Sequence, residues 1–176
     1  MSDPSPAEQR AIELLDETGT LQTPVPVEQI AAAKGAQITY AAFEGDVSGV
    51  LYRESDRILI GVNSTHAPTR QRFTMAHEIG HLVMHEGRPV VVDRLVRVNL
   101  RDGTSNQEEI EANAFAAELL MPRRLISAQI QRLVERARPI VPQELVAELA
   151  GAFRVSLEAM SYRLENLGIL DPNAGF

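Results

Sequence analysis

The stretch His77-Glu78-Ile79-Gly80-His81 holds two imidazoles and a carboxylate at a spacing suited to metal chemistry. On a helix, positions i and i+4 lie on one face, so His77 and His81 can direct both rings toward one ion. Glu78 directly follows the first histidine, which lets its carboxylate reach a water on the ion rather than the ion itself. Two nitrogen ligands, an open coordination position and an adjacent base are what a zinc hydrolase needs. The motif therefore predicts a hydrolytic Zn2+ centre with Glu78 as the general base.

A catalytic zinc site usually has a third protein ligand, and the remaining histidines are poor candidates for it. His85 stands eight residues after His77, about 12 Å along a helix axis, so these two rings cannot share one ion with His81. His66 precedes the helix on a turn-like segment and reaches the site only if the chain folds back. We expect His85 to be structural, bonding a helix-end carbonyl, or else to contact substrate. The third ligand is expected to be a carboxylate.

Three glutamates in one later segment are candidates for that ligand: Glu109, Glu111 and Glu118. Glu109 shares a helical face with Asn113 at i+4. A zinc-bound histidine usually donates its second ring N–H to an oxygen acceptor, so one helix can supply both a ligand and that acceptor. Glu111 lies about 200° around the helix from Glu109, and Glu118 follows about two and a half turns later. We therefore expect Glu109 to bind the metal and Asn113 to orient a ligand histidine.

The same residues also fit a simpler interpretation, in which two surface histidines and a solvated glutamate lie on an ordinary helix. That interpretation leaves Gly80 unexplained, because a glycine inside a helix costs ~1 kcal/mol relative to alanine. Close approach of another element at the site would account for Gly80.

Two blocks of the sequence, residues 72–85 and 109–122, resemble the ImmA/IrrE family of metallo-endopeptidases in content, order and spacing. The blocks read Arg-Phe-Thr-Met-Ala-His-Glu-Ile-Gly-His-Leu-Val-Met-His and Glu-Ile-Glu-Ala-Asn-Ala-Phe-Ala-Ala-Glu-Leu-Leu-Met-Pro. A looser similarity covers roughly residues 25–170. This resemblance is specific, because both blocks occur together.

The resemblance implies a gluzincin-like zinc site of His77, His81 and Glu109, with Glu78 as catalytic base. It also implies that the hairpin before the motif helix borders the active-site cleft. Members of the family are often regulatory proteases that cleave a repressor, so the expected partner is a protein substrate, in particular a transcriptional repressor. The same ligands fit a second hypothesis, a non-catalytic zinc-containing regulator that binds such a partner.

The elements that position these residues are expected to form an α+β fold. A small antiparallel β-sheet or hairpin would pack on a mostly helical zincin-like core, with C-terminal helices after it. Strands are predicted over 37–43, 47–53, 57–62, 90–92 and 95–98, with a polar loop over 101–106. Helices are predicted over 6–17, 26–35, 67–85, 105–121, 122–136, 142–153 and 156–167. The edge of the 47–62 hairpin is expected to bind substrate as an added strand.

The chain length of 176 residues fits one domain with small appendages. We expect an N-terminal helix and connector over residues 1–24 and a catalytic core over residues 25–122. A C-terminal helical segment over residues 123–176 would then pack on that core.

Charge argues against a dedicated nucleic-acid-binding protein. Residues 1–121 carry 18 acidic and 10 basic side chains, net −8, whereas residues 122–176 carry 6 and 7, net +1. Nucleic-acid-binding proteins normally show a basic footprint. Residues 149–160 have the cadence of a helix-turn-helix, but a helix beginning at Ser156 would present Arg163 as its only basic residue. DNA binding is therefore the least favoured of three hypotheses.

Composition also limits the ligands and the compartment. The chain has no Cys, so a metal site must use His and carboxylate ligands. No apolar run approaches the ~20 residues that cross a bilayer. Residues 1–6 have neither the basic nor the apolar region of a signal peptide. These features predict a cytoplasmic protein with no membrane partner.

Overall fold

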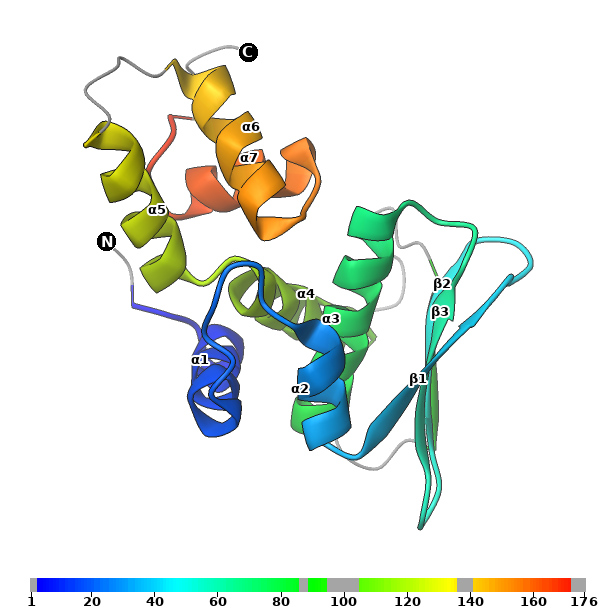
Figure 1. The fold of residues 1–176 in the computed structure, drawn as a ribbon. Coiled ribbons are helices and arrows are strands. Elements are labelled where there is room, and N and C mark those ends of the chain that lie inside the picture. Colours follow the sequence, from blue (N-terminus) through cyan, green and yellow to red (C-terminus); the bar gives the residue numbers. More distant parts are fainter. Residues whose placement is uncertain (1–2, 86–88, 95–104, 136–140, 172–176) are drawn as a thin grey trace.

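The computed structural model describes residues 3–85, 89–94, 105–135 and 141–171, and within them the chain is α+β, as predicted (Figure 1). The helices are α1 (Pro6–Thr18), α2 (Val27–Ala33), α3 (Pro68–Met84), α4 (Ser105–Leu120), α5 (Arg123–Val134), α6 (Pro142–Phe153) and α7 (Leu157–Asn166). The strands are β1 (Ala36–Ala41), β2 (Val47–Arg53), β3 (Ile58–Asn63) and β4 (Val90–Arg94). The strand predicted over 95–98 and most of the loop predicted over 101–106 lie outside the described residues.

The strands form one sheet in the order β1-β3-β2-β4. β2 and β3 make the predicted antiparallel hairpin, and β4 pairs antiparallel with β2. β1 runs parallel to β3, so the sheet is mixed. The expected free hairpin edge is therefore wrong, because β1 covers β3 and β4 covers β2 through long-range pairing. Among the described strands, the outer ones are β1 and β4.

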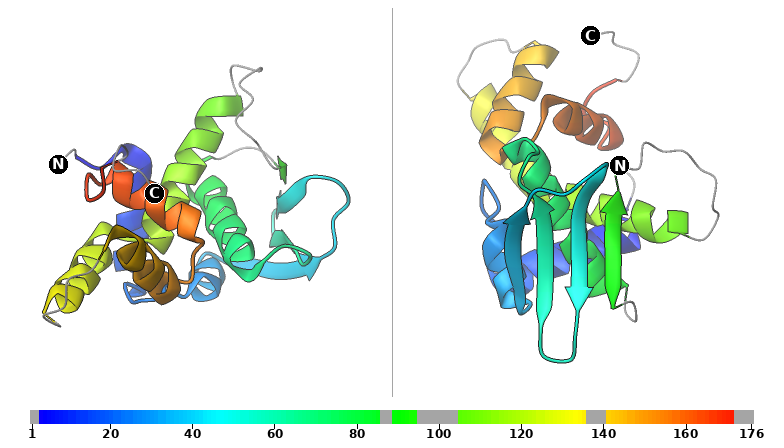
Figure 2. Two further views of the ribbon diagram at one scale, coloured as in Figure 1. Left: turned by 90° about the horizontal axis from the view of Figure 1, so that it is seen from above. Right: turned by 90° about the vertical axis from the view of Figure 1, so that its right-hand side faces the viewer.

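The helices all lie on one side of the sheet (Figure 2). α3 packs directly on it, and α4 packs on α3. The core between sheet and helices is apolar and fully buried, with Leu51 and Ile60 from the sheet, Ile79 from α3 and Phe115 from α4. This packing follows from amphipathic patterning, since the apolar face of each element turns toward the shared core. No helix in the described residues is long and apolar enough to cross a membrane.

Gly80 lies on the side of α3 that packs against α4. A Cβ atom placed on Gly80 would stand 3.1 Å from Phe115 Cδ1 and 3.3 Å from Ala112 Cα. A side chain there would push the two helices apart, so the glycine permits their close contact. The close approach expected from the sequence is confirmed.

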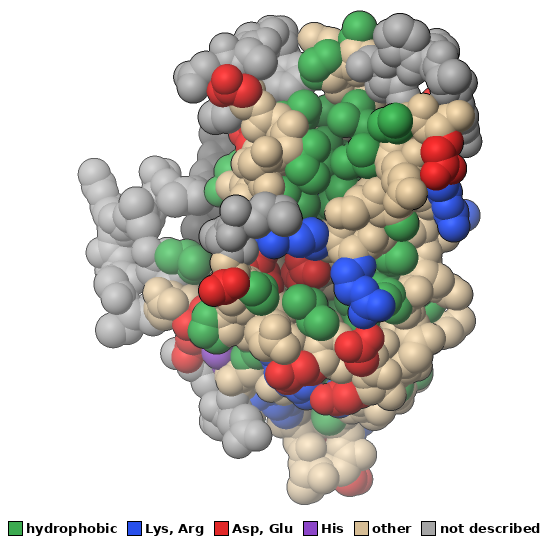
Figure 3. All heavy atoms as spheres, turned by 90° about the vertical axis from the view of Figure 1, so that its left-hand side faces the viewer, with side chains coloured by type: hydrophobic (Ala, Val, Ile, Leu, Met, Phe, Trp, Pro, Cys, Tyr) green, Lys and Arg blue, Asp and Glu red, His purple; other side chains and the backbone are tan. Residues whose placement is uncertain are grey.

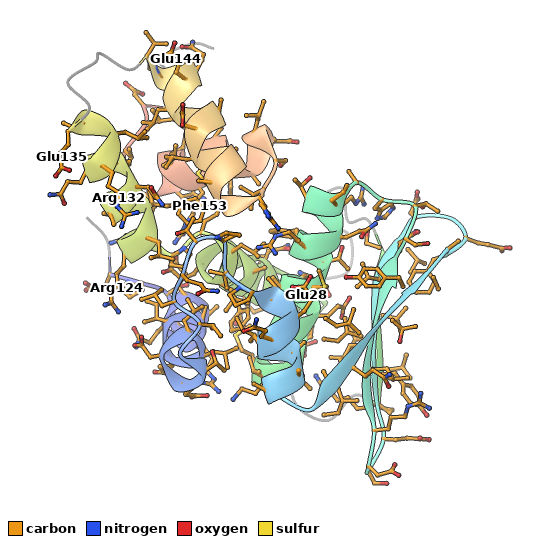
Figure 4. All side chains as sticks on the ribbon, in the orientation of Figure 1. Glu28, Arg124, Arg132, Glu135, Glu144 and Phe153 are labelled. Atoms are coloured by element: carbon orange, nitrogen blue, oxygen red, sulfur yellow. The ribbon has the colours of Figure 1, made fainter. Side chains whose placement is uncertain are left out.

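The C-terminal helices α5, α6 and α7 form a group above α4 in Figure 1, and Arg163 of α7 donates to the Met121 carbonyl, directly after α4. Phe153, at the end of α6, is fully buried at the junction with the core (Figure 4). α7 begins after Ser156, whose hydroxyl accepts a hydrogen bond from the Ala159 amide at 3.1 Å. The helix boundaries predicted for this region agree with the structure to within two residues.

Candidate metal centre

The structure brings His77 and His81 of α3 together with Glu109 of α4. The His77 Nε2 atom lies 3.2 Å from Glu109 Oε2, and the His81 Nε2 atom lies 3.3 Å from Glu109 Oε1. The two Nε2 atoms are 3.0 Å apart. Each residue thus offers one ligand atom, and all three atoms lie within 4.8 Å of one another. Two buried imidazoles and a carboxylate at this spacing can hold one divalent cation.

Asn113 lies behind His77, one turn after Glu109 on α4. Its side-chain oxygen is 3.0 Å from His77 Nδ1. An amide oxygen only accepts hydrogen bonds, so His77 Nδ1 donates, and in a neutral ring the lone pair is then on Nε2, the atom that faces the other ligand atoms. The position predicted for Asn113 from the i+4 spacing is the position that the structure gives it.

Glu78 is fully buried on α3, where strand β2 passes over it. A Cβ atom placed on Gly49 of β2 would lie 2.7 Å from Glu78 Oε1 and 2.5 Å from Thr74 Cγ2. The sheet therefore reaches the helix only because residue 49 has no side chain. The role of Gly49 was missed from the sequence, although a glycine inside a strand is a signal of close approach.

The ring of His85 contacts His81 and Glu111 instead of the helix-end carbonyl expected from the sequence. His85 Nδ1 is 3.0 Å from His81 Nδ1, and His85 Nε2 is 3.0 Å from Glu111 Oε2. Glu111 points away from Glu109, as its 200° offset predicted, but its partner was missed. Only the i+4 step from His81 to His85 was visible in the sequence.

Arg53 of β2 holds the last turn of α3. Its guanidinium donates to the carbonyl oxygens of His81, at 2.5 Å, and His85, at 2.6 Å. The His81 carbonyl also accepts from the His85 backbone N–H at 3.1 Å, so the arginine adds a second donor there, and a cation at a helix C-terminus is favourable. This anchor was also missed, because it depends on how β2 lies across α3.

The electrostatics of the site favour an ionised carboxylate. Burial raises the pKa of Glu109, but hydrogen bonds from His77 and His81 and the charges of these rings outweigh burial and hold that pKa well below its usual range. A carboxylate that stays ionised between two imidazoles is a good donor for a cation. Imidazole nitrogen and carboxylate oxygen are the ligands that zinc accepts in thiol-free sites.

A cleft of about 380 Å³ opens beside two of the three candidate ligands, His77 and Glu109. Its base includes His77, Glu109 and Asn113. One wall comes from β2 and the first turns of α3, where Arg70 donates to Ser48 Oγ at 3.0 Å. The opposite wall comes from residues 155–159, at the turn between α6 and α7. His77 and Glu109 therefore border a space that a peptide segment can enter.

Such a cluster on an α+β core is compatible with a metal-dependent hydrolase. Residues 31–165 match the model of the peptidase M78 family, described as the IrrE N-terminal-like domain. This match covers most of the chain, so the chain belongs to the ImmA/IrrE family. The matched range contains the three candidate ligands and most of the C-terminal helices.

Curated relatives bear metallopeptidase names. The radiation response metalloprotease IrrE of Deinococcus radiodurans is 33% identical over 108 residues, 60% of this chain and 30% of the relative. The protein of the same name from Deinococcus deserti is 35% identical over 111 residues, 60% of this chain and 35% of the relative. The metallopeptidase ImmA of Bacillus subtilis is 25% identical over 126 residues, 70% of this chain and 66% of the relative. The aligned region thus spans about a third of either IrrE protein.

Proposed function

We propose that this protein is a zinc-dependent endopeptidase that cleaves a repressor or another regulatory protein. The observation that carries the proposal is the convergence of His77, His81 and Glu109 from two helices, with Glu78 buried next to the first ligand. Three protein ligands leave one coordination position for the reaction, which is the pattern of catalytic rather than structural zinc. The curated relatives are named as metalloproteases or a metallopeptidase, in agreement with this reading.

When bound, zinc polarises the scissile carbonyl and lowers the pKa of a coordinated water toward ~7. The side chains of the protein orient the ligands and transfer the proton. Asn113 fixes His77 in the tautomer whose Nε2 can bind the ion. Glu78 takes a proton from the attacking water and passes it to the leaving amine. Burial of Glu78 beneath β2 keeps its carboxylate in one place for both transfers.

The outer strand β4 offers a way to hold an extended peptide. β4 pairs with β2, and Ser48 of β2 lines the cleft. A peptide that adds to the other edge of β4 would make backbone hydrogen bonds and run past the cleft. The edge of β4 thus replaces the edge of the 47–62 hairpin as the proposed place where a substrate adds as a strand.

The deciding experiment compares wild type with Glu78→Gln on a candidate repressor, with cleavage followed by mass spectrometry and metal content measured directly. We expect equal metal content and a loss of cleavage of 10²–10⁴-fold, the usual contribution of a general base. Glu13→Gln, on the exposed face of α1, serves as the matched control and should cleave normally. Full activity of Glu78→Gln would contradict the mechanism. Stable capture of the partner by both proteins without cleavage would instead favour the non-catalytic zinc regulator.

The structure gives no support to the DNA-binding hypothesis at α7, the candidate recognition helix. Arg163, the only basic residue of the would-be recognition helix α7, is 4% exposed and pairs with Glu118 and Glu8. It is therefore not available to phosphate groups. On the face drawn in Figure 3, hydrophobic side chains gather in the upper part, where the C-terminal helices lie.

A further inference from the structure

Behind His81, a line of two further side chains leads away from the metal centre. We propose that His85 and Glu111 are positioning residues that set the tautomer of His81, so that its Nε2 lone pair faces the ion. This inference rests on the proposed function only in taking His81 as a metal ligand. It requires no particular substrate and no particular reaction.

The direction of each hydrogen bond follows from the last group in the line. The Glu111 carboxylate can only accept, so His85 Nε2, 3.0 Å away, donates. A neutral imidazole has one N–H, so His85 Nδ1 then accepts. The atom 3.0 Å from it is His81 Nδ1, which must therefore donate. With its proton on Nδ1, His81 has a free lone pair on Nε2, the atom that faces His77 and Glu109.

The surroundings hold this line in place. Arg53 binds the carbonyl oxygens of both His81 and His85, which fixes the backbone from which the two rings extend. Gln107 donates to Glu111 Oε1 at 2.8 Å, which leaves Oε2 for His85. The side chains of His81 and His85 are 1% and 11% exposed. Water is therefore largely excluded from the His81–His85 hydrogen bond, whereas the Glu111 side chain, 39% exposed, is also in contact with solvent.

The location of the line separates a positioning role from contact with substrate. Among the described residues, those lining the cleft include His77, Glu109 and Asn113, but neither His85 nor Glu111. The two ligand histidines are thus supported differently. A neutral amide backs His77 directly, whereas a carboxylate backs His81 through a second imidazole. Partners of this kind raise the basicity of a ligand histidine as well as fixing its tautomer.

The test uses zinc-loaded protein with ¹⁵N-labelled histidine. In wild type, NMR should show His85 with its proton on Nε2, and the His81 Nδ1–H should be protected from exchange with water. His85→Phe should remove that protection and weaken zinc binding 10–100-fold in a chelator competition. His85→Gln, whose amide oxygen can accept from His81, should recover most of the affinity. His66→Phe is the matched control and should change neither measurement.

The proposal is overturned if His85 carries its proton on Nδ1, or if His85→Phe leaves both exchange and zinc affinity unchanged. Should His85→Phe fail to fold, the wild-type tautomer and the variant Glu111→Ala still decide. Glu111→Ala should lower zinc affinity by a smaller factor than His85→Phe. Unchanged zinc affinity in Glu111→Ala, together with a His85 proton on Nδ1, would refute the proposed hydrogen bonds from Glu111 through His85 to His81. None of these measurements uses a peptide. A protein that binds zinc with this tautomer but cleaves nothing would contradict the proposed function alone.

Discussion

Two polar clusters share helix α4, and they satisfy their carboxylates in different ways. Glu109 lies between His77 and His81 near the start of the helix. Glu118, nine residues later, is 4% exposed and pairs with the guanidinium of Arg163, which also bonds Glu8 at 2.8 Å. Among the described residues, no Lys or Arg forms an ion pair with Glu109. One helix therefore carries one acid paired with an arginine and one acid placed between two imidazoles.

The difference teaches how a buried acid reveals its role. A carboxylate removed from water needs a compensating charge or several hydrogen bonds. At Glu118 the compensation is an arginine from α7, and the result is a closed structural contact. At Glu109 the neighbours are imidazoles that can offer lone pairs, and the result is a ligand set for a cation. Matched Glu→Gln substitutions at the two positions test this contrast.

Glu109→Gln should have the largest effect, on metal binding. An amide is a much poorer zinc ligand than a carboxylate. Removing only the hydrogen-bond partner of a ligand can lower metal affinity by up to ~100-fold, so replacing the ligand itself should lower zinc affinity by more. The metal-free protein should keep its thermal stability. Competition with a chelator measures the first quantity and calorimetry of the metal-free protein the second. Retention of wild-type affinity would remove Glu109 from the ligand set.

Glu118→Gln should instead lower the stability of the fold and leave zinc affinity nearly unchanged. Arg163 would keep a buried charge with Glu8 as its only carboxylate, and breaking a buried ion pair costs about 3 kcal/mol or more. Denaturant unfolding should show this loss, whereas zinc affinity per folded molecule should stay within a few fold of wild type. A large loss of zinc affinity with unchanged stability would show that the two clusters are not separate.

Gly49→Ala should affect catalysis more than either binding or folding. The added Cβ would overlap the positions of Glu78 Oε1 and Thr74 Cγ2, so the carboxylate must move. A displacement of about 1 Å in a catalytic group can cost about 10²-fold in rate. We expect kcat to fall by 10–100-fold with full metal content. Gly151→Ala, on α6 with open space around the new Cβ, is the matched control and should stabilise the helix by ~1 kcal/mol without changing kcat.

The smallest effect concerns the dependence of stability on pH at the Arg163 cluster. Burial raises the pKa of Glu8, but the hydrogen bond from Arg163, with those from Ser5, outweighs burial and lowers it below the ordinary 4.5. The stabilisation is therefore complete above about pH 4.5 and is lost as the pH falls through the lowered pKa of the folded state. Glu8→Gln should cost about 1 kcal/mol at neutral pH and make the melting temperature less sensitive to acid. An unchanged acid dependence would assign that sensitivity to other carboxylates.

The parts of the site that the sequence predicted are those that local periodicity determines. His77 with His81, and Glu109 with Asn113, are i and i+4 pairs, and their mutual orientation follows from helix geometry alone. Gly49 and Arg53 were missed because their roles depend on the register of β2 across α3. Glu111 was missed because its partner is on a different helix. The wrong hairpin edge has the same origin, since nothing local to residues 47–62 shows that β4 pairs with β2.

Arg163 has a consequence for cooperativity. Its guanidinium joins α7 to the helix that carries Glu109, and through Glu8 it also joins α1. The N-terminal helix, the ligand-bearing helix and the last described helix thus share one buried charge, although they are far apart in sequence. Opening α7 leaves Glu118 without its buried cation, and opening α1 or α4 removes one of the two carboxylates that compensate Arg163. We therefore expect α1, α4 and α7 to unfold in a single thermal transition, and the ligand Glu109 on α4 to be displaced in that same step.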